Sequence, residues 1–128
     1  MNESVFYRGV LIALSERRER PFVAEGNSFH AAFRSMLEFA KTEPSTASAA
    51  VRMLENFDPV FGVSPEATEM LLEGERDFIV ALDNPRLKVA QLKLTPVQAR
   101  EELEGLPSPE VFRKLAEHLN EQLQGGEG

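Results

Sequence analysis

Residues 78–98 have the sequence FIVALDNPRLKVAQLKLTPVQ, which combines two β-strand signals with a helix start. Phe78–Leu82 is a short apolar run with β-branched side chains, and Asp83–Arg86 has the residue types of a turn. Leu87–Leu94 then alternates leucine and valine with lysine. These features predict a β-hairpin. Because the apolar face changes parity within the second strand, we also expect a bulge near Ala90-Gln91.

A hydroxyl residue followed by proline ends this stretch at Thr95-Pro96, and the same pair occurs at Ser64-Pro65 and Ser108-Pro109. The hydroxyl can accept a hydrogen bond from an unpaired N–H of a first helical turn, and proline fits the first helical position. Thr95 and Gln98 also match a capping box. The three pairs predict helices over about residues 65–74, 96–104 and 109–123.

Two further helices are predicted upstream, on either side of Pro44. The first, over residues 28–41, places one apolar face at helical spacing, made of Phe29, Ala32, Phe33, Met36, Leu37 and Ala40. The second covers residues 45–57 and carries small side chains on its apolar face. Glycines lie near two predicted helix ends, Gly74 and Gly105, and Gly74 is expected to form a left-handed cap.

The N-terminal segment is ambiguous, because Val5–Leu14 is apolar on every side of a helical wheel. A strand that is buried on both faces gives such a run, and Phe22–Ala24 could return as a second strand after the charged turn. We therefore expect a hairpin over about residues 5–24. A first helix over residues 3–17 is the alternative.

The order of these elements predicts an α+β fold. Strands and helices come in runs rather than in alternation, so a small antiparallel sheet from two hairpins, about 5–24 and 78–94, is expected to pack against about five helices. A chain of 128 residues is expected to form a single domain, here over residues 1–124, with a flexible C-terminal tail over 125–128.

Composition narrows the classes of function. The net charge of −7 disfavours nucleic acid as a partner, since affinity for phosphates comes largely from lysine and arginine. Without cysteine there are no disulfides and no thiolate metal sites. No apolar run approaches the ~20 residues of a membrane helix, so we expect a cytoplasmic protein. The glutamate-rich, cysteine-free composition leans weakly toward a thermophilic source.

Catalytic, cofactor and metal motifs are not found in the sequence. It contains no Gly-x-Ser-x-Gly, no Walker loop, no dinucleotide-type glycine pattern and no His-Glu-x-x-His. We therefore expect no cofactor and no metal, and a chain that is more readily a binding protein than an enzyme. Surface histidines on solvated helices would explain both His30 and His118.

One candidate ligand site lies at the start of the 28–41 helix. Glu25 precedes the Gly26-Asn27-Ser28 turn, His30 lies in the first helical turn, and Arg34 follows one turn later. Such a group could hold an anion or act as a general base. The alternative function is therefore an anion-binding protein or small enzyme centred on these three residues.

Two segments are candidates for contact with another protein. Arg17, Arg18 and Arg20 form a locally basic turn on an acidic chain, and arginine forks suit carboxylates and phosphates. Val60 and Phe61 lie in an apolar connector that either folds back on the core or meets a partner. The favoured function is an interaction or regulatory module that binds another protein or a second copy of itself.

Overall fold

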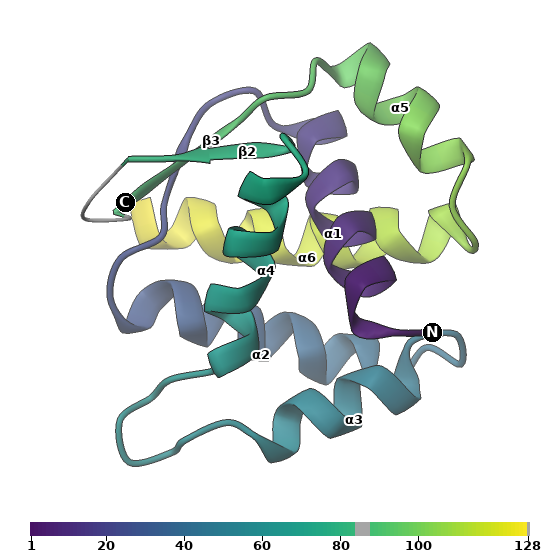
Figure 1. The fold of residues 1–128 in the computed structure, drawn as a ribbon. Coiled ribbons are helices and arrows are strands. Elements are labelled where there is room, and N and C mark those ends of the chain that lie inside the picture. Colours follow the sequence, from purple (N-terminus) through teal and green to yellow (C-terminus); the bar gives the residue numbers. More distant parts are fainter. Residues whose placement is uncertain (84–87, 128) are drawn as a thin grey trace.

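The computed structural model describes residues 1–83 and 88–127, with side chains described as far as Leu123. In the described part, six helices surround a core and flank a three-stranded antiparallel sheet (Figure 1), which confirms the α+β class. The elements are α1 Glu3–Arg17, β1 Phe22–Val23, α2 Asn27–Ala40, α3 Ala47–Glu55, α4 Pro65–Arg76, β2 Val80–Leu82, β3 Val89–Leu92, α5 Pro96–Glu104 and α6 Pro109–Glu127.

The N-terminal segment is a helix, so the hairpin predicted over residues 5–24 is wrong and the alternative, a helix over residues 3–17, is confirmed. Asn2 caps it, because its Oδ1 accepts a hydrogen bond of 2.9 Å from the N–H of Val5. Residues 9–15 are all buried, since α1 packs against α4, α5 and α6. A helix enclosed on all sides has no polar face, and its sequence therefore shows no helical period.

The hairpin predicted over residues 78–94 is confirmed. β2 and β3 pair antiparallel, with Val80 opposite Leu92 and Leu82 opposite Ala90. Their register is continuous, so the bulge predicted near Ala90-Gln91 is wrong. The predicted turn over residues 83–86 falls largely outside the described residues.

The third strand, β1, pairs with β3 on the side away from β2, which gives the order β1-β3-β2. One face of this sheet packs against α4 and α6. The buried strand residues are Phe22, Val80, Leu82, Ala90 and Leu92. The short second strand expected near residue 22 therefore exists, but its partner is a segment more than 60 residues away in sequence.

The five helices predicted after residue 25 are all present, with ends shifted by a few residues. α6 continues past its predicted end at residue 123 to Glu127. The flexibility predicted for residues 125–128 stays a prediction, and Gly128 lies outside the described residues. Pro65 and Pro96 occupy the first turns of α4 and α5 as expected.

The predicted caps are confirmed at one helix and not at another. Thr95 and Gln98 form the expected capping box at α5, with hydrogen bonds of 3.2 Å and 3.0 Å. At α4 the side chain of Ser64 makes no capping hydrogen bond; it is buried, and its Oγ lies 3.5 Å from a carboxylate oxygen of Glu66.

Gly74 does not end α4, so its predicted role as a left-handed cap is wrong. It lies inside the helix, where a Cβ would come within 2.5 Å of a methyl carbon of Leu11. The glycine thus permits α4 to approach α1 closely. The left-handed conformation falls instead on Phe78, with φ of 62°, just after α4.

Figure 1 shows α1 in the middle of the molecule with α6 crossing behind it, α2 and α3 on one side and the sheet on the other. The buried core lies where these helices pack together. Gly9 of α1 is buried against Phe112 of α6, and the ring of Tyr7 is buried as well. Both regions predicted to bind partners, the turn after α1 and the α3–α4 connector, lie at the edges of this packed core (Figure 1).

Candidate functional site

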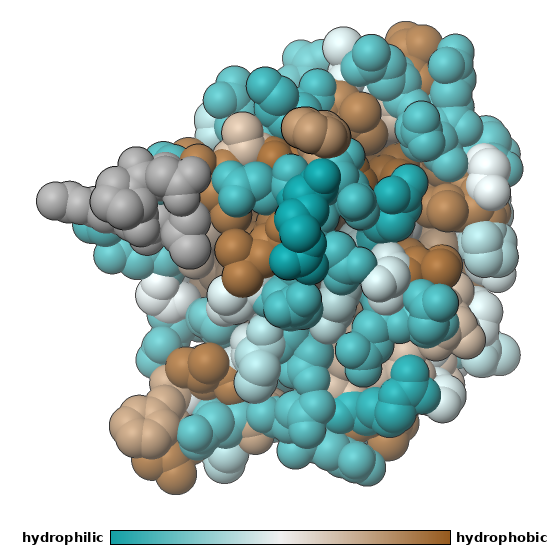
Figure 2. Space-filling view, viewed as in Figure 1, coloured by the Kyte–Doolittle hydropathy of each residue, from teal (hydrophilic) through white to brown (hydrophobic). Residues whose placement is uncertain are grey.

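The connector between α3 and α4 presents two large apolar side chains to solvent. Val60 is 82% exposed and Phe61 is 69% exposed. In Figure 2 apolar surface protrudes at the lower left of the molecule, where Figure 1 places this connector. The structure thus answers the alternative that the sequence left open, because this loop does not fold back on the core.

The loop that carries them has an ordered backbone. Asp58 and Val63 form an antiparallel bridge, with the Asp58 N–H donating to the Val63 carbonyl oxygen at 2.8 Å. Asp58 Oδ1 accepts hydrogen bonds from the N–H groups of Val60 (2.9 Å) and Phe61 (3.3 Å). Gly62 supplies the positive φ of 67° that closes the turn. Val60 and Phe61 are therefore held at the tip of a short, internally bonded loop.

The far end of the loop is tied to α2. The Ser64 N–H donates to His30 Nδ1 at 3.0 Å, so the half-buried imidazole bridges the start of α2 and the start of α4. Gly62 also lies close to Asn27, whose amide would contact a Cβ at that position at 3.2 Å. These contacts anchor the loop to a long helix of the core.

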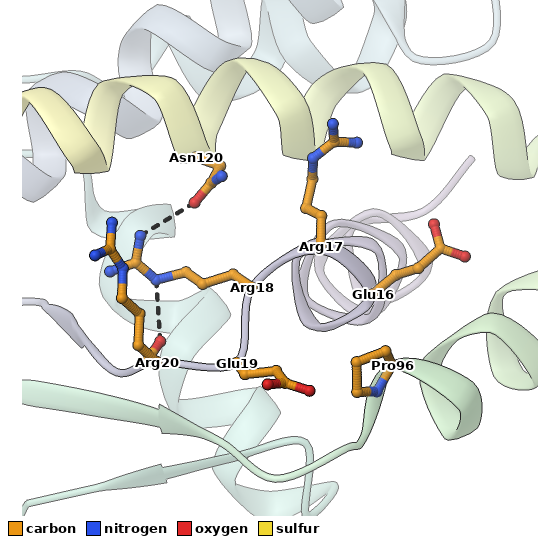
Figure 3. Close-up of a pocket in the computed structure, with 7 residues that line it drawn as sticks. All are labelled: Glu16, Arg17, Arg18, Glu19, Arg20, Pro96 and Asn120. Atoms are coloured by element: carbon orange, nitrogen blue, oxygen red, sulfur yellow. Dashed lines mark hydrogen bonds between the residues drawn. The ribbon is translucent and has the colours of Figure 1, made fainter.

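A second feature is an open pocket of about 500 Å³ at the C-terminal end of α1. Figure 3 shows Arg18 and Arg20 at one end of it and Pro96 of α5 at the other. Asn120 of α6 completes the wall. The pocket brings together all three arginines predicted from the sequence, which are Arg17, Arg18 and Arg20.

Arg18 is only 4% exposed, and its guanidinium is bonded within the chain. Nε donates to the Arg20 carbonyl (3.0 Å), Nη1 to Asn120 Oδ1 (3.1 Å) and Nη2 to the Pro21 carbonyl (2.8 Å). The group also lies over the Phe22 ring, 5.8 Å from its centroid. Arg18 therefore joins α1, β1 and α6, and its predicted contact with a partner stays a prediction.

An ion-pair network borders this pocket. Arg113 of α6 donates to Glu16 Oε1 at 2.9 Å and to Glu16 Oε2 at 3.1 Å, and it also binds Glu104 (2.7 Å) and Glu110. These hydrogen bonds, led by those to Glu16 and Glu104, raise the pKa of Arg113. Arg100 lies 3.8 Å from the same Glu16 carboxylate. The charge of Glu16 is thus compensated from α5 and α6.

The residues of the predicted anion site each have a different partner. Glu25 pairs with Lys88 at 3.4 Å, and His30 bonds the backbone of Ser64. Arg34 stacks on the ring of Phe57, 4.4 Å from its centroid, at the edge of a shallow hollow of about 310 Å³. His30 does not line that hollow. The ligand-binding role predicted for the three residues stays a prediction.

One polar pair was not predicted from the sequence. Ser35 Oγ lies 2.8 Å from His118 Nε2, and the imidazole stacks on Phe39 with ring centroids 5.5 Å apart. A hydroxyl beside an imidazole is the arrangement of a nucleophile and its base. Both residues stand inside helices, however, where the N–H groups that would bind an oxyanion are used by the helix itself. The pair is best described as a cross-link between α2 and α6.

One further polar group, the Tyr7 hydroxyl, is buried in the core. Burial, together with the charge of nearby glutamates led by Glu3, raises the pKa of the Tyr7 hydroxyl.

In the part of the chain that the structure describes, no three histidine, aspartate or glutamate side chains are grouped as metal ligands. Nor does any helix among the described residues combine the length and apolarity needed to cross a membrane.

The candidate site is therefore two surfaces, the apolar loop over residues 58–63 and the arginine-lined pocket over residues 16–20. Comparison of the chain with protein-family models, with curated proteins and with solved structures finds no match.

Proposed function

We propose that this chain is a non-catalytic, cytoplasmic module that binds another protein, and that the loop over residues 58–63 is the centre of its contact surface. The observation that carries this proposal is the exposure of Val60 and Phe61 at the tip of a loop with an ordered backbone. Burial of an apolar side chain in a partner is favourable by about 1.5–3 kcal/mol. A loop whose backbone is already hydrogen-bonded loses little backbone entropy on binding.

Two side chains do not make a complete interface, because stable interfaces of standard size bury about 800 Å² on each partner. The loop is accordingly proposed as the energetic centre of a larger contact, with the hollow beside Arg34 and Phe57 as adjoining surface. A second copy of the chain is the alternative partner, which light scattering during size exclusion distinguishes from a different protein.

The test uses two matched double variants. Val60→Ser with Phe61→Ser removes the proposed anchors. Val97→Ser with Phe78→Ser removes exposed apolar side chains of the same kinds from α5 and from the segment just after α4. We expect the first variant to lose, and the second to keep, the partner recovered from a native extract and its affinity measured with the purified partner. Equal binding by both variants would overturn the proposal.

A direct readout complements the loss of binding. A photoreactive benzoyl-phenylalanine at position 61 is expected to cross-link to the partner, whereas the same group at position 78 is not. A cross-link that forms equally from both positions would count against the loop as the contact. Both positions are exposed, so neither replacement disturbs the core.

A further inference from the structure

We propose that His30 makes the attachment of the loop over residues 58–63 to α2 sensitive to pH, so that protonation of its imidazole releases the loop. The contact that carries this inference is one hydrogen bond, which the Ser64 N–H donates to His30 Nδ1 at 3.0 Å. The inference deepens the proposed function, because this loop is the proposed contact surface, and it rests on that function only for its effect on a partner.

The hydrogen bond exists only while Nδ1 is unprotonated. A nitrogen that accepts a hydrogen bond offers a lone pair, so the neutral ring carries its proton on Nε2. Ser64 is fully buried, and His30 Nδ1 is the acceptor that the structure gives its N–H. A proton on Nδ1 would face this N–H and leave a buried donor without an acceptor, which is destabilising.

The protonated ring has a different partner within reach. The Ser64 carbonyl oxygen lies 3.1 Å from Nδ1, and it also accepts the Ala67 N–H in the first turn of α4. The Ser64 N–H belongs to the peptide that ends the loop, whereas the carbonyl belongs to the peptide that begins α4. Protonation therefore moves the hydrogen bond of the imidazole from the loop to the helix, and the loop loses this tie to α2.

The position of the ring also opposes a positive charge. His30 is the fourth residue of α2, and Ser64 is the N-cap of α4. The N-terminal ends of helices carry partial positive charge, so both helices disfavour an imidazolium in the present contact. A neutral ring meets no such repulsion. Since histidine side chains change protonation between about pH 5 and 8, the contact is set against the proton in the physiological range.

The charged groups around the ring each have a partner of their own. Before and along α2 these groups are Glu25, which is paired with a lysine, and Arg34, which is stacked on an aromatic ring. In the loop, Asp58 accepts the N–H groups of two loop residues. On α4, Glu66 accepts a hydrogen bond of 2.5 Å from Asn56 Nδ2. An imidazolium that kept the present contact would have to draw one of the carboxylates out of its own hydrogen bonds.

The experiment measures amide hydrogen exchange and imidazole resonances by NMR on the ¹⁵N-labelled full chain, between about pH 7.5 and 5. We expect the protection of the Ser64 amide, corrected for the intrinsic exchange rate, to fall about tenfold or more as His30 takes up its proton. The amides of residues 58–63 should shift with the same midpoint. Amides in the buried part of α1 should keep their protection, which separates release of the loop from unfolding of the chain.

Three variants isolate the role of Nδ1. His30→Asn places an amide oxygen near the position of Nδ1, so it keeps an acceptor that does not titrate, and Ser64 should stay protected at both ends of the pH range. His30→Ala has no acceptor, and Ser64 should be unprotected throughout. His118→Gln removes the other histidine of the chain and should respond to pH as the unchanged chain does.

Three results would each overturn the proposal: a His30 imidazole that stays neutral at pH 5, a titration of His30 that leaves the Ser64 amide protected, or the same loss of protection in His30→Asn. If His30→Ala does not fold, His30→Asn still decides the question. No partner is needed for these measurements, and the Val60→Ser, Phe61→Ser variant should show the same pH response. Failure of this inference and failure of the proposed function are therefore distinguishable.

Discussion

Gly9 of α1 lies directly against the ring of Phe112 of α6, and a Cβ at position 9 would overlap three carbons of that ring. Phe112 is fully buried and cannot move aside without displacing its neighbours in the core. The crossing of these two helices, which are about 100 residues apart in sequence, thus depends on the absence of one methyl group.

We expect Gly9→Ala to lower the free energy of unfolding by about 1–3 kcal/mol, because overpacking outweighs the gain in helix propensity. Denaturation by urea measures the effect. Gly105→Ala is the matched control: this glycine has an ordinary φ of −81°, and its Cβ would meet only the Glu102 carbonyl oxygen, at 3.4 Å. A similar loss in both variants would contradict the packing explanation.

Tyr7→Phe is expected to leave the free energy of unfolding unchanged or to raise it by about 1 kcal/mol. The Tyr7 hydroxyl is buried and has no hydrogen-bond partner in the structure, and a buried unpaired polar group is destabilising. Thermal and urea denaturation provide the measurement. A loss of more than about 1 kcal/mol would show that the hydroxyl is bonded in solution.

Tyr7 is also expected to make the free energy of unfolding depend on pH. Burial raises the pKa of Tyr7 in the folded chain, so above pH ~10 the unfolded chain binds fewer protons than the folded one. Stability should therefore fall as the pH rises through this range, and less so in Tyr7→Phe. Tyr7 is the only tyrosine and the chain has no tryptophan, so absorbance near 295 nm reports its ionisation directly. Tyrosinate that appears at pH 10 with the fold intact would contradict this prediction.

Phe78→Gly is expected to stabilise the fold by about 1 kcal/mol. Phe78 adopts a φ of 62°, which is costly for a bulky side chain and free of strain for glycine, while its ring is 81% exposed and contributes little packing. Phe78→Ala removes the ring and retains the backbone strain, so it should bring no comparable gain. The comparison of the two melting temperatures decides whether the backbone or the ring is responsible.

Arg113→Met should lower the free energy of unfolding by about 1 kcal/mol at low salt, and by less in 1 M salt, because the ion pairs with Glu16, Glu104 and Glu110 are partly exposed. Arg76→Met, which breaks a single exposed pair with Glu69, is the control and should have an effect below about 0.5 kcal/mol. Identical losses at both salt concentrations would indicate that the arginine acts through its packing alone.

The sequence was sufficient to predict elements that have a clear local signal, such as an apolar face in the core opposite a polar face in solvent. α2 has one buried and one exposed face, and the β2–β3 hairpin follows local turn and strand chemistry, so both could be predicted from the sequence. For α1 the sequence left a helix as the alternative to the favoured hairpin, because a helix that is buried on nearly all sides lacks a helical period. Gly74 was assigned wrongly because the need for glycine there comes from Leu11, a distant residue.

For the candidate surfaces too, the sequence predicted local segments but not contacts between residues that are distant in sequence. The arginine turn and the apolar connector are continuous segments, so composition was enough to select Arg17, Arg18, Arg20, Val60 and Phe61. Composition could not show that Arg18 is buried, because this burial depends on Asn120 and Phe22. Ser35 and His118 are 83 residues apart and form a pair only after α2 meets α6, so no local pattern indicates it.

The central position of α1 also determines when the chain can fold. α1 is made before α4, α5 and α6, yet these three helices enclose it. Until they emerge from the ribosome, its apolar side chains, from Phe6 to Leu14, have no core to enter. We expect productive folding to begin only after α6 is synthesised, and to be slow for a chain so rich in helix because its decisive contacts are distant in sequence. We therefore expect the nascent chain to be prone to aggregation until these helices have been made.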